Sequence, residues 1–161
     1  MAGNERQAEF WNGSAGNTWA ELQERLDRML EPLTLPALKA AAVKKGERVI
    51  DVGCGCGSTT IALVERGASA WGIDLSAPML ERAKERTRNT KNIAFSQMDA
   101  ALANYSPDHH LLFSRFGVMF FDDPYATFTR LRDSLVEDGR LTFLCWQKAS
   151  DNPWMSTAGY A

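Results

Sequence analysis

Residues 48–58 constrain the fold of this chain more than any other stretch. A short β-branched run contains an acid, Asp51, and three glycines then alternate with small residues before helix-like spacing begins at Ser58. This order predicts a strand, a tight turn and a helix N-terminus. Glycine tolerates positive φ and has no Cβ to keep a ligand away from the backbone. We therefore expect a nucleotide-like cofactor at the carboxyl end of a parallel sheet.

Strand and helix patterns alternate along the chain after this turn. Further strands are predicted at residues 69–75, 92–98, 111–116 and 140–146, the last entered by a turn at 137–139. Ser76 and Asp123 stand where N-caps are expected, each with a proline in the first turn that follows. Residues 117–121 are predicted to form an apolar loop. Such alternation is typical of the α/β class with right-handed crossovers.

The N-terminal part is predicted to be helical. We expect a helical cap at residues 1–45, a cofactor-binding α/β core at 46–147 and an irregular tail at 148–161. Within the cap, residues 12–17 are predicted to be a loop, followed by a helix to Pro32 and a short one at 36–43. Trp11 is interpreted as a lid over the cofactor. Trp19 is expected in the core because it begins a helical stripe with Leu22, Leu26, Met29 and Leu30.

Length and composition indicate one globular domain. The chain has 161 residues, of which 45% are hydrophobic and 24% charged, with a net charge of −2. This balance predicts no general attraction to nucleic acid or to an acidic membrane surface. No apolar run approaches the roughly 18–20 residues of a spanning helix and the N-terminus is polar, so we expect a cytoplasmic protein without membrane contact.

The three cysteines, Cys54, Cys56 and Cys145, are too few for a disulfide framework. Cys54 and Cys56 are separated by one residue, but the pair lacks the further ligands that a four-coordinate zinc site needs. No metal is therefore predicted, and both side chains are interpreted as small residues that pack the turn.

Three acids, Asp51, Asp74 and Asp99, fall at the carboxyl ends of successive predicted strands. Ordinary helix caps would not explain an acid after each of three consecutive strands. Asp74 lies 17 residues after Gly57, the distance at which a carboxylate from a second strand reaches a ribose. A third acid suits an adenine amino group, and Asp51 can orient a cationic amino group directly or through water.

The glycine spacing separates two classes of cofactor. A dinucleotide site has the pattern G-x-G-x-x-G, whereas Gly53, Gly55 and Gly57 are each separated by a single residue and Ser58 follows. An NAD(P)-dependent oxidoreductase is therefore a disfavoured alternative.

Several of these motifs resemble those of the class I S-adenosylmethionine-dependent methyltransferases. The similar segments are residues 51–57, 72–76 and 97–100, and residues 114–121 with 123–124 resemble a subgroup of bacterial small-molecule methyltransferases, as do residues 11–19. The resemblance implies a three-layer Rossmann-like sandwich with a mostly parallel sheet. It also implies S-adenosyl-L-methionine as cofactor, S-adenosyl-L-homocysteine as product and a small molecule as methyl acceptor.

The same resemblance implies roles for individual residues. The backbone from Gly53 through Cys54 to Gly55 would approach the methionine part, and Asp51 would hold its amino group. Asp74 would bind the ribose hydroxyls, Asp99 with the Ala100 amide would read adenine, and Leu75 would flank it. The Ser114 main chain would face the methionyl end.

The sequence departs from the family in two ways. His110 stands where the family often has an acid, and about five strands are predicted where the family has seven, so the last two are missing. The fifth strand would then be an exposed edge, a place for self-pairing. A module that binds the cofactor but is catalytically incomplete is therefore the main alternative.

No catalytic residue is assigned from the sequence. Methyl transfer requires mainly that a nucleophile be placed in line with the sulfonium methyl. If a base is needed, the nearby candidates are His109, His110, Tyr105 and Asp122.

Overall fold

A parallel sheet forms the centre of the molecule. The computed structural model of the chain describes residues 4–152. Its five strands are all parallel to their neighbours, in the order β3-β2-β1-β4-β5. They are β1 (Arg48–Val52), β2 (Ser69–Asp74), β3 (Ile93–Gln97), β4 (His109–Arg115) and β5 (Leu135–Leu144). The prediction of an α/β protein with a parallel sheet is confirmed.

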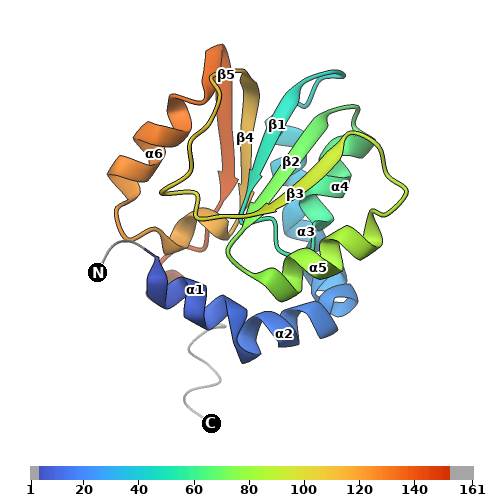
Figure 1. Cartoon of the computed structure of the whole chain (residues 1–161), viewed down its shortest axis with the longest axis vertical. Helices are drawn as coiled ribbons and strands as arrows, with labels where there is room; N and C mark the ends of the chain where they lie inside the picture. Colours follow the sequence, from blue (N-terminus) through green and yellow to red (C-terminus); the bar gives the residue numbers. More distant parts are fainter. Residues whose placement is uncertain (1–3, 153–161) are drawn as a thin grey trace.

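Helices cover the two faces of the sheet unequally (Figure 1). The helices α3 (Gln23–Ala41), α4 (Ser58–Glu65) and α5 (Ala77–Arg86) lie on one face, and α6 (Pro124–Arg132) lies on the other. A core on the first face joins Leu38 of α3 and Leu63 of α4 to Phe113 of β4. On the second face Leu131 of α6 packs against Ile50 and Leu112. Short 3-10 helices follow β4 (Gly117–Phe120) and β5 (Ala149–Asp151).

The first two helices, α1 (Glu5–Asn12) and α2 (Ser14–Glu21), lie across the edge at which the strand arrows end (Figure 1). The predicted loop at residues 12–17 is therefore wrong, because only Gly13 separates the two helices. Asparagine, glycine and serine are common in loops, but here their backbone is held in helical turns by contact with the rest of the protein. α1 and α2 thereby become the roof of the carboxyl edge.

The predicted helix end at Pro32 is also wrong. α3 continues through Pro32 and Pro36 to Ala41, where Ala42 has a left-handed backbone with φ of 46°. Each internal proline removes one helical hydrogen bond. The buried positions Leu30, Thr34 and Leu38 nevertheless continue with a spacing of four residues across both prolines. Burial of this continuous face outweighs the local preference of proline to end a helix.

The apolar stripe predicted to enter the core faces a cavity instead. Of its five members, only Leu30 is buried, while Trp19 is half-buried and Met29 is 64% exposed. The helical period identifies which side chains share a face, but it contains no information about what lies opposite that face. The expectation that Trp19 belongs to the core is therefore wrong.

The fifth strand begins earlier than expected, at Leu135. His109 pairs with Leu135 and Leu111 pairs with Arg140, so two steps along β4 correspond to five along β5. Residues 137–139, predicted to form a turn, lie within this wide bulge. Residues 117–120, predicted to be a loop, form a 3-10 helix.

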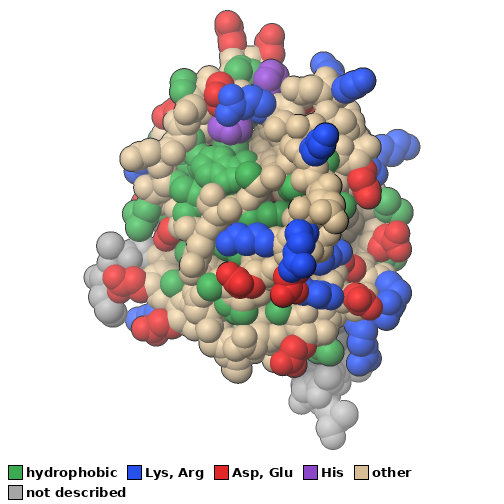
Figure 2. All heavy atoms as spheres, turned by 45° about the vertical axis from the view of Figure 1, so that its right-hand side comes forward, with side chains coloured by type: hydrophobic (Ala, Val, Ile, Leu, Met, Phe, Trp, Pro, Cys, Tyr) green, Lys and Arg blue, Asp and Glu red, His purple; other side chains and the backbone are tan. Residues whose placement is uncertain are grey.

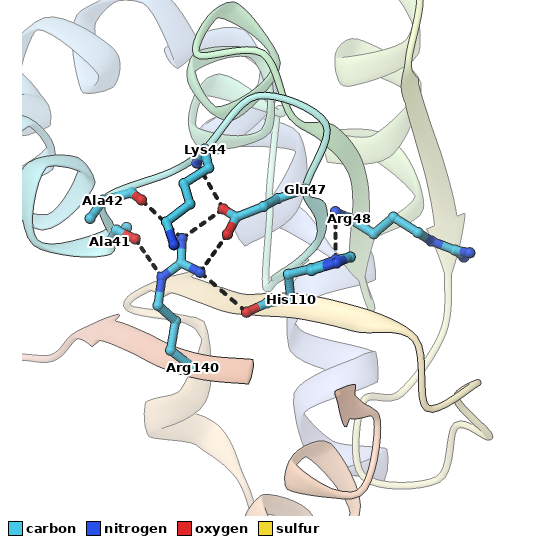
Figure 3. A network of polar contacts seen from close by, with 7 residues as sticks. All are labelled: Ala41, Ala42, Lys44, Glu47, Arg48, His110 and Arg140. Carbon is cyan, nitrogen blue, oxygen red and sulfur yellow. Dashed lines mark hydrogen bonds and ion pairs between the residues drawn. The ribbon is translucent and has the colours of Figure 1, made fainter. Parts of the chain in front are cut away.

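At the opposite edge of the sheet, where the strands begin, an ion pair and its neighbouring hydrogen bonds join β5 to the end of α3 (Figure 3). The Arg140 side chain donates to both carboxylate oxygens of Glu47, each at 2.7 Å. It also donates to the carbonyls of Ala41, Ala42 and His110. Figure 3 shows these contacts gathered around one guanidinium group.

Charged side chains of both signs are intermixed on the face drawn in Figure 2, apart from a hydrophobic patch below the histidines. Among the residues visible there, the structure offers no extended basic surface of the kind that binds a phosphate backbone. Within residues 4–152, no helix is both long and apolar enough to cross a membrane.

Candidate functional site

The glycine turn brings bare backbone to the carboxyl edge of the sheet. Gly53, Gly55 and Gly57 have positive φ values of 68°, 54° and 79°. A Cβ on Gly53 would lie 2.5 Å from the Cα of Gly117, which follows β4. Two backbone segments therefore pack directly against each other here, which requires residues without a Cβ.

Asp51 lies directly behind this turn and is fully buried. Its Oδ2 accepts hydrogen bonds from the hydroxyls of Thr59 and Thr60, both at 2.6 Å. Its Oδ1 has no partner among the described residues. Burial raises the pKa of Asp51 to about 6, while the two hydroxyls and the positive charge of Arg115 oppose this rise. Such an unpaired buried oxygen calls for a donor or a cation.

Asp74, at the end of β2, is held by backbone amides. Its Oδ2 accepts from Gly55 N at 2.8 Å, and its Oδ1 accepts from Ser76 N at 2.9 Å. Burial raises the pKa of Asp74, and these amide donors oppose the rise. A carboxylate oxygen has two lone pairs, so each oxygen retains capacity for one ligand hydroxyl.

Asp99 follows β3 and is oriented from the N-terminal part. Its Oδ1 accepts from Asn4 Nδ2 at 2.9 Å and from Ala101 N at 2.8 Å. Asn4 is 6% exposed, and its own Oδ1 accepts from Asp122 N. Sequence reasoning missed Asn4, because an asparagine at the start of a chain has no distinguishing pattern.

The glycine turn, Asp74 and Asp99 border one cavity of about 350 Å³, within the range of small-molecule sites. Eight of the sequence-predicted site residues line it: Trp11, Gly53, Cys54, Gly55, Asp74, Leu75, Asp99 and Ala100. Asp51 and Ser114 do not line the cavity. The Ser114 hydroxyl instead donates to the Val52 carbonyl at 2.7 Å and accepts from Gly117 N. Ser114 therefore braces the place where β1 and β4 end.

Aromatic and thioether side chains form much of the remaining wall. Trp11 makes edge contacts with Trp19 and Phe120, at ring-centre distances of 5.8 and 5.7 Å. Phe116 and Trp146 are stacked at 4.7 Å with their planes 5° apart. Phe116 has a φ of 68°, and a bulky residue in this region is strained. Trp11 thus lines the cavity from the roof helix α1, and its interpretation as a lid over the cofactor stays a prediction.

α1 is fastened to the turn that holds Asp74. Asn12 Nδ2 donates to the Leu75 carbonyl, and Asn12 Oδ1 accepts from Ala77 N, both at 2.9 Å. Ser76 Oγ donates to the Trp11 carbonyl at 2.7 Å while it caps α5. A Cβ on Gly16 would lie 1.9 Å from that same carbonyl. The roof therefore depends on glycine at this position.

Arg115 was also missed by the sequence reasoning. It follows Ser114 at the end of β4 and lines the cavity. Its Nη1 donates to Thr34 Oγ1 at 2.9 Å, and its Nη2 donates to Ser58 Oγ at 3.0 Å. Burial lowers the pKa of Arg115, and the negative charges of Asp51 and Asp27 oppose this. The available signal was a lone cation at the carboxyl end of a central strand.

The histidines suggested as bases are far from this cavity in the fold. His109 and His110 begin β4, at the opposite edge of the sheet. His109 Nδ1 contacts the Ser106 carbonyl, and His110 Nδ1 accepts from Arg48 N. The suggestion that they lie near the site is wrong, because they are the first two residues of the seven-residue strand β4, whose opposite end adjoins the cavity.

The two other suggested bases are not marked as catalytic by their contacts. The Tyr105 hydroxyl donates to the Ala100 carbonyl at 3.0 Å, and Asp122 binds Asn4 only through its backbone amide.

The cysteines of the turn are free thiols packed in the interior. Burial raises the pKa of Cys54 well above its usual range and that of Cys56 to about 11. Within residues 4–152, no group of three or more His, Cys, Asp or Glu side chains is arranged to hold a metal ion.

Known proteins are similar to this chain in fold and in the sequence of the sheet and its glycine turn. The profile of the family described as methyltransferase domain matches residues 49–139. A ubiquinone biosynthesis O-methyltransferase of Methylococcus capsulatus is 36% identical over 99 residues, which cover 59% of this chain and 42% of that protein. The chain spans 42–47% of the length of the first three curated relatives it matches.

Two solved structures extend the likeness. An S-adenosylmethionine dependent methyltransferase from Mesorhizobium loti has a TM-score of 0.62 and 30% identity, covering 67% of this chain and 50% of that one. Phosphoethanolamine N-methyltransferase 2 of Haemonchus contortus, solved with S-adenosyl-L-methionine, has a TM-score of 0.77 and 22% identity, covering 92% of this chain and 39% of that one. The second likeness concerns the fold alone.

Proposed function

Because this chain belongs to the methyltransferase domain family, we propose that it binds S-adenosyl-L-methionine in the cavity at the carboxyl edge of the sheet. The whole protein then transfers a methyl group to a small molecule and releases S-adenosyl-L-homocysteine. The Mesorhizobium loti structure, 30% identical to this chain, supports the choice of cofactor through its description as S-adenosylmethionine dependent.

The observation that carries this proposal is the unpaired Oδ1 of Asp51. A buried carboxylate with a free oxygen favours a cationic donor, and the amino-acid end of the cofactor contains an ammonium group. Asp51 does not line the cavity. The ammonium group of the cofactor therefore contacts Asp51 either directly, behind the glycine turn, or through a bridging water molecule. Gly53 and Cys54, which follow Asp51 by two and three residues, line the cavity and bring the ligand close to this region.

The remaining site residues fit the rest of the cofactor. Asp74 accepts from the ribose hydroxyls with the lone pairs that Gly55 N and Ser76 N leave free. Asp99 accepts from the adenine amino group, next to the Ala100 amide, and its carboxylate is held in place by Asn4. Leu75 and Trp11 supply apolar surface over the nucleoside.

The cofactor supplies an activated methyl group on a sulfonium ion. The chain's own contribution is to hold the nucleoside and the amino-acid end, and so to fix where the methyl group points. The apolar wall at Trp11, Phe116 and Phe120 excludes water from that place. We assign no base: among the described residues at the cavity, Asp74 and Asp99 serve the cofactor and Asp27 is paired with Arg86.

A small-molecule acceptor is favoured by the names of relatives, such as the ubiquinone biosynthesis enzyme, and by the largely apolar cavity. We further propose that β5, an outer strand with Leu141 and Phe143 at 40% and 48% exposure, is a surface for self-association. The cytoplasmic location stays a prediction from composition.

A second candidate function is cofactor binding without turnover. It is favoured by one observation: the residues assigned at the cavity all serve the cofactor, and none is assigned to the methyl acceptor. An oxidoreductase has no support from the relatives.

Calorimetric titration of the folded protein with S-adenosyl-L-methionine and S-adenosyl-L-homocysteine tests the proposal, and we expect saturable heat with both. If neither ligand gives heat, the proposal is overturned. Tight binding of NAD alone would support the oxidoreductase hypothesis. Transfer of a radiolabelled methyl group to a panel of phenols, amines and carboxylic acids then separates the two candidates. Binding without transfer to any panel member would favour the second.

A further inference from the structure

Arg115 is a cation in the wall of the cavity without a carboxylate partner. Two of its five N–H groups donate to hydroxyls, those of Thr34 and Ser58. Within residues 4–152, no carboxylate oxygen lies within ion-pair distance of it. A guanidinium group removed from water favours an anion that it can bind with two parallel hydrogen bonds.

The other partly buried arginines of the chain have such partners. Arg140 binds both oxygens of Glu47, and Arg86 Nη2 binds Asp27 Oδ2 at 2.9 Å. Arg115 therefore differs from these arginines: its guanidinium group is not paired with a carboxylate and can bind an anionic ligand.

Asp51 complements Arg115. Arg115 binds the hydroxyl of Ser58, and Asp51 binds that of the next residue, Thr59. Among the described residues, Asp51 Oδ1 nevertheless accepts no hydrogen bond. A cation with free donors thus lies near an anion with a free acceptor, and both adjoin the glycine turn. An α-amino-acid group contains the complementary pair, an ammonium and a carboxylate.

We propose that Arg115 binds the carboxylate of the ligand, and that this carboxylate belongs to the amino-acid end whose ammonium group is held at Asp51. The inference rests on the proposed function for the identity of that ligand. Ser58 and Thr34 fix the guanidinium from two helices, α4 and α3, and leave its other donors for the carboxylate. A carboxylate on the methyl acceptor is the other source of the same chemistry.

The test compares S-adenosyl-L-methionine with its decarboxylated form, which retains the amine. Wild-type protein is expected to bind the decarboxylated form at least tenfold more weakly. Arg115→Met should weaken S-adenosyl-L-methionine at least tenfold and change the affinity for the decarboxylated form by less than twofold. Asp51→Asn is the matched control, because it should weaken both ligands, each of which contains the amine.

A purely structural role for Arg115 predicts a different result. Arg115→Met would then weaken both ligands equally, and that outcome would overturn the proposal. Arg115→Lys retains the charge but lacks the planar fork, so it should lose part of the affinity for S-adenosyl-L-methionine alone. It provides the comparison if the methionine variant does not fold.

Benzoate titrated into protein saturated with S-adenosyl-L-homocysteine tests the second source. If Arg115→Met leaves S-adenosyl-L-methionine binding unchanged but abolishes benzoate binding, Arg115 serves the acceptor. If neither binding depends on Arg115, the proposal is wrong. If the wild-type protein binds no S-adenosyl-L-methionine, the proposed function is contradicted instead. Benzoate is then titrated into the ligand-free protein: binding that is lost in Arg115→Met supports an anion site at Arg115, and absence of binding excludes it.

Discussion

Two arginines at opposite edges of one sheet differ in how far their donors are used. Arg140, at the edge where the strands begin, donates to Glu47 and to three backbone carbonyls. Arg115, where the strands end, donates to two hydroxyls. The first group is saturated by the protein and the second is not. A side chain that serves the fold is satisfied within the fold, whereas one that serves a ligand retains unused capacity.

The carboxyl groups at the two edges differ in the same sense. The Arg140 side chain, by its hydrogen bonds, lowers the pKa of Glu47 to about 2, whereas burial raises the pKa of Asp51 to about 6. The ionised form of Glu47 therefore stabilises the folded protein, and the ionised form of Asp51 destabilises it. Substitutions at the two edges should therefore change stability and ligand binding independently.

The largest effect is expected for Arg140→Met. The substitution leaves Glu47, which is 8% exposed, without its cation, and breaking such a pair costs about 3 kcal/mol of the free energy of unfolding. Chemical denaturation at pH 7 measures it. Cofactor affinity of the protein that remains folded should be unchanged.

The pH dependence of this loss provides a check. The pKa of Glu47 is lower in the folded state than its ordinary 4.5, so its contribution is present above pH 4.5 and disappears as the pH falls toward 2. The difference between wild type and variant should shrink over that interval. A difference that is independent of pH would contradict the assignment to the ion pair.

Asp51→Asn should have the opposite effect on stability. The folded pKa of about 6 exceeds the ordinary 3.8, so the native state binds more protons between these values and wild-type stability falls as the pH rises through them. Because the amide has no charge to bury, the variant should gain about 3 kcal/mol at pH 8 from the pKa difference. Its buried amide N–H groups offset about 1 kcal/mol of this gain, so the ligand-free variant should be more stable than wild type by about 2 kcal/mol. Denaturation curves at pH 4 and pH 8 measure the difference.

The same residue gives a prediction for the ligand. A bound ammonium group favours ionised Asp51, so S-adenosyl-L-homocysteine should bind more tightly as the pH rises from 4 to 6 and change little above. In Asp51→Asn this dependence should be absent. A variant less stable than wild type at pH 8, with unchanged affinity, would place Asp51 with the structural residues.

Asp74→Ala should weaken cofactor binding by about 1–3 kcal/mol, because a charged acceptor for the ribose is lost. Calorimetry measures the affinity. Part of any effect would come from the release of Gly55 N and Ser76 N. Asp74→Asn, which retains an acceptor oxygen, is the comparison, and an affinity unchanged in both variants would exclude Asp74 from the site.

The smallest effect is expected for Arg48→Ala at the beginning of β1. Its ion pair with Asp108 joins side chains that are 52% and 41% exposed, and such pairs contribute less than about 0.5 kcal/mol. Neither stability nor cofactor affinity should change measurably. A loss of stability as large as that of Arg140→Met would show that solvent exposure does not explain the different contributions of the two ion pairs.

The central sheet and the acids at its carboxyl edge could be predicted because their determinants are local. The β-branched residues before Asp51 favour a strand, and the glycines that follow permit the backbone that only they adopt readily. Ser76 and Asp123 mark helix starts by bonds to residues three positions ahead, Met79 N and Ala126 N. Each signal is contained within a few residues of the chain.

The roof and the cation could not be predicted, because they depend on contacts distant in sequence. Asn4 reaches Asp99 across 95 positions, and Arg115 reaches Thr34 across 81. α3 continues through Pro32 and Pro36 because Leu30 and Leu38 are buried, and local helix propensity contains no information about this burial. The bulge before Arg140 follows from pairing with β4 and is not apparent in the residues themselves.

The contact between Gly53 and Gly117 limits how this pocket can be redesigned. Any side chain at Gly117 would meet the Val52 carbonyl at 2.4 Å and the Gly53 Cα at 2.7 Å. That part of the cavity is shaped by main chain alone, so a library of point substitutions there would yield misfolded protein rather than altered selectivity. An engineer who wants a new ligand preference has to work on the replaceable rings and thioethers that line the rest of the cavity, in α1, α2, α3 and the end of the 3-10 helix after β4.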